Sequence, residues 1–523
     1  MISLVGAARR RWRDRPPESA WRGGGIPVNT VVTGLRTIVR GLVSLALLPL
    51  LLHRIGAAPT GLFFLATTLT GYFTVAETGL GTSVTKYVAE HRATGEAWQL
   101  GSILRASLLL MVGIGVVVAL IIALLALLAG HALFGVKATN SQAVPTLLVA
   151  AVTALFYWPT RLGPAALQGL ERYDLNAVIQ MTCSVVMLAL IYVVSEQSHS
   201  VALLTAIFGA VLVLEGAIAG AIAWPRLGLR RGVGRWRGAH LRPALGFGAG
   251  LSVLGLADTF VYESDRIVLA AFVGAASIAI YQIALQIHNV VRQLSGLLAT
   301  ALISPSARLV AERRMERLRE LVLVGSLYTV VLTVPVVVLI LVLAEPMVEA
   351  WVGHRYVRYA VYVQIFVSYW LVHANTGAVG AAIVGIGRIR AFVWLTAIGA
   401  VLTLGLSVWL VAEWGTVGVI WGTVIPAWLG VPLWMHYALR QVGIAKARYA
   451  RDVLAPGYLP IALWTAPMVA LALALEPSGI VGLGAFCAVA LAVLWLALLP
   501  TLRSRWRRAL SEPDIPAAAA LIT

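Results

Sequence analysis

The sequence is poor in the residues that make a protein soluble or that build a metal or disulfide site. Only 12% of its 523 residues are charged, whereas soluble domains carry about 25%. Its two cysteines, Cys183 and Cys487, lie in separate apolar segments, which leaves no spacing for a zinc site, an iron–sulfur cluster or a disulfide framework. The sequence also lacks the G-x-x-x-x-G-K-[ST] pattern of a phosphate-binding ATPase loop. These absences exclude a soluble enzyme, and we expect no metal and no cofactor.

Long apolar runs dominate what is present. Hydrophobic residues make up 60% of the chain, and runs near the ~20-residue length of a membrane span recur between residues 28 and 500. We therefore expect an all-α polytopic membrane protein with about fourteen transmembrane helices. The predicted spans are 28–52, 60–81, 104–130, 144–168, 175–195, 200–225, 244–272, 274–303, 320–344, 357–387, 390–412, 416–440, 456–475 and 478–500.

The charge balance is basic, with 40 Lys and Arg against 22 Asp and Glu. These cations lie between the predicted spans on alternate sides, and the predicted outer loops hold only Arg54, Lys137, Arg355 and Arg358. This asymmetry predicts that both termini are cytoplasmic. The basic excess therefore reflects membrane topology and contact with membrane lipids, and we expect no nucleic-acid partner.

The predicted outer loops are short, roughly a dozen residues at most. Polytopic glycosyltransferases and polymerases need larger extramembrane loops to bind sugars. We therefore expect that the protein is not an enzyme.

An internal repeat divides the chain into two halves. The segment Gly56–Ala66 aligns with Gly274–Ala284, six predicted helices later. An even number of helices gives both copies the same orientation, as in parallel repeats that enclose a central cavity. The predicted organisation is a basic cytoplasmic tail at 1–27, a first lobe at 28–225, a basic cytoplasmic linker at 226–243, a second lobe at 244–440, an extra helix pair at 441–500 and a cytoplasmic tail at 501–523.

Two segments of the sequence resemble a known family. Residues Leu48–Glu96 and Ser264–Ala284 are similar to the Wzx-type polysaccharide and O-antigen flippases of the multidrug, oligosaccharidyl-lipid and polysaccharide exporter superfamily. The resemblance covers about residues 28–440 and rests on loose patterns. It implies a V-shaped, alternating-access transporter of the bacterial inner membrane that moves undecaprenyl-pyrophosphate-linked oligosaccharide repeat units for surface polysaccharide synthesis.

The helix pair after Arg440 departs from the family's usual twelve helices, and fourteen is the count of the related lipid II flippases. A lipid II flippase and a multidrug exporter therefore remain alternatives. A scaffold subunit of a polysaccharide assembly complex is an alternative outside transport. The expected partners are the lipid-linked substrate and membrane lipids, with a polysaccharide polymerase or assembly complex as a further candidate.

Polar side chains form stripes on several predicted helices. Such side chains are costly toward lipid and face a cavity or the helix bundle, although neutral ones also serve as hydrogen bonds between helices. The candidate neutral cavity residues are Asn29, Thr33, Tyr157, Gln282, Gln286 and Asn289.

Three arginines lie inside predicted helices of the first lobe. An Arg within the membrane costs at least ~2.5 kcal/mol and needs a partner. Arg36 and Arg40 are one helical turn apart, and their planar guanidinium groups match the two phosphates of a pyrophosphate. Arg161 is a further candidate. The alternatives are a structural salt bridge with Glu77 and contact with the inner interface.

Acidic residues in the membrane are candidates for ion coupling. Buried carboxylates at Asp258 and Asp265 could take up and release a proton during transport. Glu77 stands where the family commonly has an acidic residue. Glu263 and Arg266 are three residues apart and are expected to pair, and the alternative is that arginines neutralise these acids for structural reasons.

Overall fold

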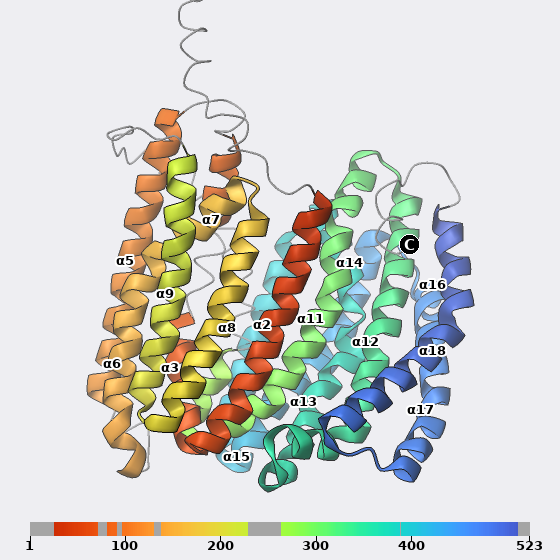
Figure 1. Cartoon of the computed structure of the whole chain (residues 1–523). Helices are drawn as coiled ribbons and strands as arrows, with labels where there is room; N and C mark the ends of the chain where they lie inside the picture. The colour runs from red at the N-terminus through yellow and green to blue at the C-terminus, as the bar shows by residue number, and fades with distance from the viewer. Residues whose placement is uncertain are drawn as a thin grey trace, which may run out of the picture. The chain divides into compact units, whose positions relative to one another are not determined.

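The computed structural model describes residues 26–71, 81–90, 97–129, 137–227, 263–387 and 389–510. Every regular element in these ranges is a helix, as Figure 1 shows. This confirms the predicted all-α fold class. The candidates Glu77 and Asp258 lie outside the described residues, as do nearly all of the predicted linker 226–243 and much of the two predicted tails.

The chain divides into two compact units, Met1–Ala279 and Ile280–Thr523, and the division falls within one helix, α11. The first unit contains α2 (Ile26–Arg54), α3 (Ala57–Gly71), a helical segment at 81–90, α5 (Ala97–Ala129), α6 (Lys137–Thr160), α7 (Leu162–Gly169), α8 (Tyr173–Gln197), α9 (Val201–Arg226) and a helical segment at 263–272. The predicted lobe boundaries stay a prediction.

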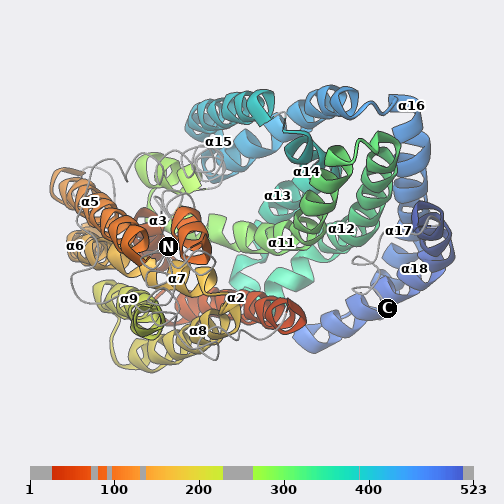
Figure 2. The ribbon, with the colours of Figure 1, turned by 90° about the horizontal axis from the view of Figure 1, so that it is seen from above.

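The second unit contains most of α11 (Ala275–Ala311), followed by α12 (Met315–Val352), the short 3-10 helix η3 (His354–Tyr359), α13 (Ala360–His373), α14 (Thr376–Ile386), α15 (Ile389–Val442), α16 (Lys446–Tyr449), the π-helix η4 (Ala450–Leu454), α17 (Ala455–Leu475) and α18 (Gly479–Leu510). Figure 2 shows these helices from one end.

Ten helices in the described ranges are long and apolar enough to cross a membrane, or eleven if the bent pair α13 and α14 is one span. α2, for example, has 29 residues and is about 44 Å long at 1.5 Å per residue, which exceeds the ~30 Å hydrocarbon core of a bilayer. These helices agree with a polytopic membrane protein. The predicted count of about fourteen spans stays a prediction.

The predicted span 144–168 corresponds to one membrane-length segment, Ser141–Gly169, that consists of two consecutive helices. α6 ends at Thr160 and α7 begins at Leu162, so Arg161 stands at the break. Pro159 immediately precedes the break, and a proline within a helix removes one backbone hydrogen bond and bends the chain. Beyond the break, α7 packs closely on α9, because a Cβ atom added at Gly163 would lie only 2.3 Å from the backbone nitrogen of Gly220.

The 54 residues of α15 form a helical hairpin. A continuous helix of this length would measure about 81 Å, far more than a bilayer requires. The backbone leaves the helical region at Gly415, where φ is 56° and ψ is −133°. The two halves then lie against each other, because a Cβ atom at Gly422 would be 2.4 Å from Oγ of Ser407. The sequence predicts this break between residues 412 and 416.

The C-terminal helix pair is fastened to the rest of the second unit by hydrogen bonds. α13 and α14 meet at a bend of 48°, and Asn375 lies at the bend. Its Nδ2 donates to the hydroxyl of Tyr458 over 2.7 Å, and that hydroxyl donates to the carbonyl of Leu371 over 2.6 Å. Nε1 of Trp495 on α18 donates to the carbonyl of Val331 on α12 over 3.0 Å. The pair is thus an integral part of this unit.

Candidate functional site

Helix α2 has an exposed apolar face and, opposite it, a polar face. Its exposed face consists of Val31, Leu35, Ile38 and Leu42, each between 50% and 70% exposed. These positions follow the i, i+4, i+7, i+11 spacing of a single helix face. The polar stripe of Thr33, Arg36 and Arg40 falls on the other side of the helix. The apolar face suits contact with lipid, and the arginines are therefore directed away from it.

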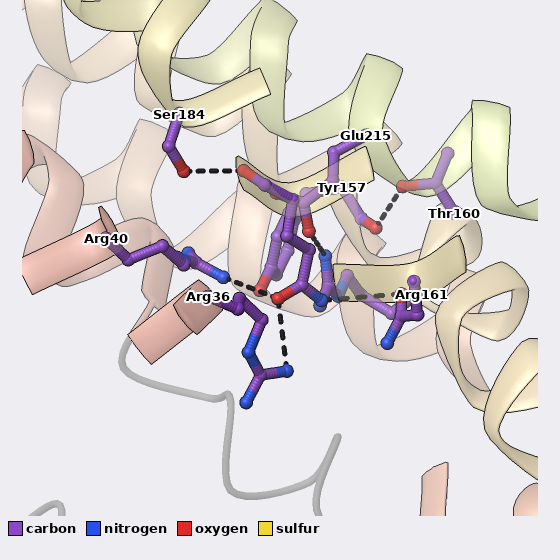
Figure 3. Close-up of polar contacts among 9 residues, drawn as sticks. Arg36, Arg40, Tyr157, Thr160, Arg161, Ser184 and Glu215 are labelled. Carbon is purple, nitrogen blue, oxygen red and sulfur yellow. Dashed lines mark hydrogen bonds and ion pairs between the residues drawn. The ribbon is translucent and has the colours of Figure 1, made fainter. Parts of the chain in front are cut away.

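The two arginines of this stripe meet at one neutral side chain. Nη1 of Arg36 donates to Oε1 of Gln180 over 3.3 Å, and Nη1 of Arg40 donates to the same oxygen over 3.0 Å (Figure 3). Gln180 lies on α8 and is 4% exposed, whereas Arg36 is half-buried and Arg40 is exposed. We call Arg36, Arg40 and Gln180 the arginine site.

Gln180 is held in place from both of its ends. Its Nε2 donates to Oδ1 of Asn176 over 3.5 Å, and its backbone carbonyl accepts the hydroxyl of Ser184 over 2.8 Å. The amide oxygen accepts from both guanidinium groups.

The arginine site has unused capacity for an anion. Among the described residues, neither Arg36 nor Arg40 forms an ion pair with a carboxylate, although the charge of Glu215 acts on Arg36, and Gln180 supplies the acceptor that each contacts. Each guanidinium carries five N–H donors, so most of them remain available. The two charges also act on each other, and like charges one helical turn apart are destabilising. A bound anion would relieve this repulsion.

Arg161 stands in a different environment. Its Nη1 forms an ion pair with Oε1 of Glu215 on α9 at 3.1 Å, and the two side chains are 10% and 3% exposed. Its guanidinium also lies over the ring of Tyr157, 5.2 Å from the centroid. Glu77, the salt-bridge partner that the sequence suggests for these arginines, lies outside the described residues, and Arg161 pairs with Glu215. The charge of Arg161 is thus compensated within the protein.

The other neutral candidates lie in several places. Tyr157 is buried, Thr33 is half-buried, and the side chain of Asn29 lies outside the described residues. Gln282, Gln286 and Asn289 share one face of α11 and belong to the second unit. Gln282 is 3% exposed. Within the described part of the chain, neither Oε1 of Gln282 nor Oδ1 of Asn289 has a hydrogen-bond partner.

Of the acidic candidates, Asp265 is described and is fully buried. The neighbouring pair that the sequence predicts is confirmed, because Arg266 Nη1 lies 2.5 Å from Oε2 of Glu263. The same nitrogen also donates to the hydroxyl of Thr68 on α3. In the described ranges, no group of three or more His, Cys, Asp and Glu side chains is placed to hold a metal ion.

Two partners were not identified from the sequence. Gln180 orients the arginines, and Glu215 pairs with Arg161. A signal for Gln180 exists, since Asn176, Gln180 and Ser184 recur every four residues along α8 and form one polar face. Nothing in the local sequence indicates that this face meets the stripe of α2.

The sequence matches the model of one protein family. Residues 28–309 match the family described as "Polysaccharide biosynthesis protein", which is more than half of the 523 residues. The chain belongs to this family. No curated protein matches it at a significant level.

Solved structures show the same fold. The structure of the lipid II flippase MurJ in an inward closed conformation aligns with a TM-score of 0.68 and 13% sequence identity. The alignment covers 92% of this chain and 99% of that chain. An inward-facing multidrug resistance MATE family transporter of the MOP superfamily aligns with a TM-score of 0.60 and 18% sequence identity. This alignment covers 78% of this chain and 94% of that chain. This member of the polysaccharide biosynthesis protein family therefore has the fold of the MOP transporters and is a multi-pass membrane protein.

Proposed function

We propose that the protein is a flippase that moves undecaprenyl-pyrophosphate-linked oligosaccharide repeat units across the bacterial inner membrane by alternating access, with both termini in the cytoplasm. The family and the fold support a transporter of a lipid-linked substrate. The observation that carries the proposal is the arginine site, where two cations share one neutral acceptor. The transfer between leaflets needs no bond to be made or broken.

A pyrophosphate matches this site in charge and in the number of its phosphates. Its two phosphates offer acceptors to two guanidinium groups, and Arg binds phosphate through two parallel N–H donors. A carboxylate beside the arginines would already neutralise them, as Glu215 does for Arg161. Gln180 instead orients both side chains and leaves their charge available to a ligand. The ion pair of Arg161 favours a structural role for that residue.

The sugars of the substrate require neutral hydrogen-bonding groups. On α11, Oε1 of Gln282 and Oδ1 of Asn289 are acceptors without a partner in the described ranges, and a buried acceptor left unpaired costs about 1–3 kcal/mol. Sugar hydroxyls are suitable donors. We assign these amides to oligosaccharide binding, and Gln286 on the same face completes the row.

Ion coupling remains part of the proposal. Asp265 is fully buried, and a buried carboxylate can exchange a proton with solvent when its surroundings change. With Glu77 and Asp258 it is our candidate for proton coupling. A transport rate that is indifferent to an imposed pH gradient and to neutralisation of all three acids would reject this part.

The arginine site also bears on the alternatives. A lipid II flippase would use the same clamp, because lipid II also carries a pyrophosphate, so the assay must compare the two substrates. A multidrug exporter for cationic drugs would favour acidic side chains instead of arginines. A scaffold subunit of an assembly complex would not need the two charges.

The experiment is a deletion in the native host with complementation, scored by exposure of lipid-linked repeat units on the outer face. Wild type restores exposure, and the Arg36→Gln/Arg40→Gln variant does not, although its level in the membrane is unchanged. The matched control is Arg54→Gln at the other end of α2, where Arg54 forms an exposed ion pair with Glu196. Exposure that survives the deletion would contradict the proposed substrate and direct attention to lipid II and drug efflux. Full exposure with the double variant would support the scaffold alternative.

A further inference from the structure

A cavity of about 520 Å³ lies in the first unit among α5, the α6–α7 break and α9. Pockets of about 300–1,000 Å³ are typical of small-molecule sites. The lining residues are apolar or small, with Thr160 as the polar exception. The arginine site contributes no residue to this lining.

The close crossing of α7 and α9 produces this cavity. A Cβ atom at Gly163 would lie 2.5 Å from the carbonyl oxygen of Gly216 and 2.3 Å from the nitrogen of Gly220, so the two backbones are in direct contact. Beside this contact, Ala217 and Ala221 are exposed and one turn apart on α9, and they fill little space. The contact between the two backbones therefore forms one wall of the cavity.

The cavity opens at a surface that faces apolar surroundings. Among its lining residues, Leu108 on α5 is 36% exposed and Trp224 on α9 is 50% exposed. In a membrane-spanning protein, apolar side chains exposed along the helices contact lipid chains. A hydrocarbon chain is thus the ligand that matches the lining.

Two arginines adjoin the lining in the chain without lining the cavity themselves. Arg226 follows the lining residue Pro225 at the end of α9 and donates to the carbonyl of Ile222, and Arg105 follows the lining residue Leu104 on α5. Trp and Arg side chains mark the headgroup level of a membrane. The lining stretch 216–225 of α9 is about 14 Å long at 1.5 Å per residue, which is close to the ~15 Å hydrocarbon depth of one leaflet.

We propose that this cavity binds one hydrocarbon chain of an anionic phospholipid. The phosphate of this lipid would contact Arg226 and Arg105 in the leaflet on which the cavity opens. The hydrocarbon chain of the lipid gains little free energy by moving from the bilayer into the cavity, because lipid tails are already in apolar surroundings. The shape of the cavity therefore selects the position of the lipid, and the two cations supply the preference for an anionic headgroup. This site is independent of the transported substrate.

The test measures lipid binding to the purified full-length protein by native mass spectrometry. Delipidated protein is titrated with phosphatidylglycerol and, separately, with phosphatidylcholine of identical chains. Each Arg near an anionic headgroup is worth a factor of about five, so the wild type should bind one phosphatidylglycerol about 25-fold more tightly than phosphatidylcholine. Arg226→Gln should reduce this preference about fivefold.

Two substitutions fill the cavity. Ala217→Phe and Ala221→Phe, singly and together, should abolish the tight phosphatidylglycerol site. Ala210→Phe is the matched control, because Ala210 is exposed on the same helix and does not line the cavity. Ala210→Phe should bind lipid as the wild type does. A monodisperse peak in size-exclusion chromatography shows for each variant that the protein is folded.

Three results would overturn the proposal. One is retention of the tight phosphatidylglycerol by the folded cavity-filling variants. A second is equal binding of the two lipids with no effect of Arg226→Gln. The third is a co-purifying protein that is lost from the cavity-filling variants in place of a lipid, which would assign the surface to a protein partner.

Discussion

Removing the negative charge from the buried ion pair of the first unit should strongly destabilise the protein. Arg161 and Glu215 lie 3.1 Å apart with side chains 10% and 3% exposed. The variant Glu215→Gln keeps the shape of the side chain and leaves Arg161 without its counter-charge. Because both groups are almost fully buried, solvent cannot replace the lost partner.

The expected cost is large compared with that of a surface pair. Breaking a buried ion pair by removing one partner costs about 3–5 kcal/mol, whereas replacing both partners by apolar residues of similar volume is often nearly neutral. Arg161→Met should therefore also be destabilising. The double variant Arg161→Met/Glu215→Met should lose much less than the sum of the two single changes.

The assay is the free energy of unfolding in mixed detergent micelles, followed by circular dichroism as the denaturing detergent is increased. Glu196→Gln is the matched control, because Glu196 makes the same kind of contact with Arg54 at 2.6 Å on side chains that are 45% and 37% exposed. An exposed pair contributes at most about 1 kcal/mol. The reasoning is refuted if Glu215→Gln costs no more than Glu196→Gln, or if the two single losses add in the double variant.

Two further stability predictions use the same assay. Gly163→Ala should cost about 1–3 kcal/mol by overpacking, because its new Cβ atom would overlap the backbone of α9. Its control, Gly113→Ala on α5, meets no atom within 4 Å and should be neutral or stabilising by up to about 1 kcal/mol; equal effects of the two changes would show that the crossing is not tight. Tyr458→Phe removes the hydroxyl between Asn375 and the carbonyl of Leu371 and should cost about 1–3 kcal/mol, whereas an unchanged stability would show that these bonds do not fasten α17.

The sequence predicted features that depend on one helix at a time. The spacing of Arg36 and Arg40 predicts that they share one face of α2, and both contact Gln180. The separation of three residues predicts the pair Glu263–Arg266. The break of α15 near Gly415 was found because two apolar runs lie back to back. In each case the information is contained within a few turns of the same segment.

Features that depend on the meeting of two helices were not predicted. Gln180 lies 140 residues from Arg40 along the chain, and Glu215 lies 54 residues from Arg161. A single sequence shows that α8 has a polar face, but it does not show which helix that face contacts. The sequence does not predict the cavity on α9 either, since glycine and alanine also occur at ordinary packed positions in membrane helices.

In the proposed function, Arg36 and Arg40 bind the pyrophosphate of a lipid-linked oligosaccharide during its transfer between leaflets. The most direct measurement uses purified protein in liposomes that contain a fluorescent undecaprenyl-pyrophosphate oligosaccharide in both leaflets. A membrane-impermeant quencher reports how fast the inner pool becomes accessible. Lipid II and a neutral glycolipid of similar size serve as comparison substrates.

We expect rapid transfer of the pyrophosphate-linked oligosaccharide by the wild type and by Arg54→Gln. Each lost charged hydrogen bond is worth about 1.5–3 kcal/mol, so Arg36→Gln/Arg40→Gln should be slower by at least about tenfold. Wild-type transfer of this substrate at the protein-free rate would contradict the proposed function. Equal rates for the wild type and the double variant would contradict the role of the arginine site.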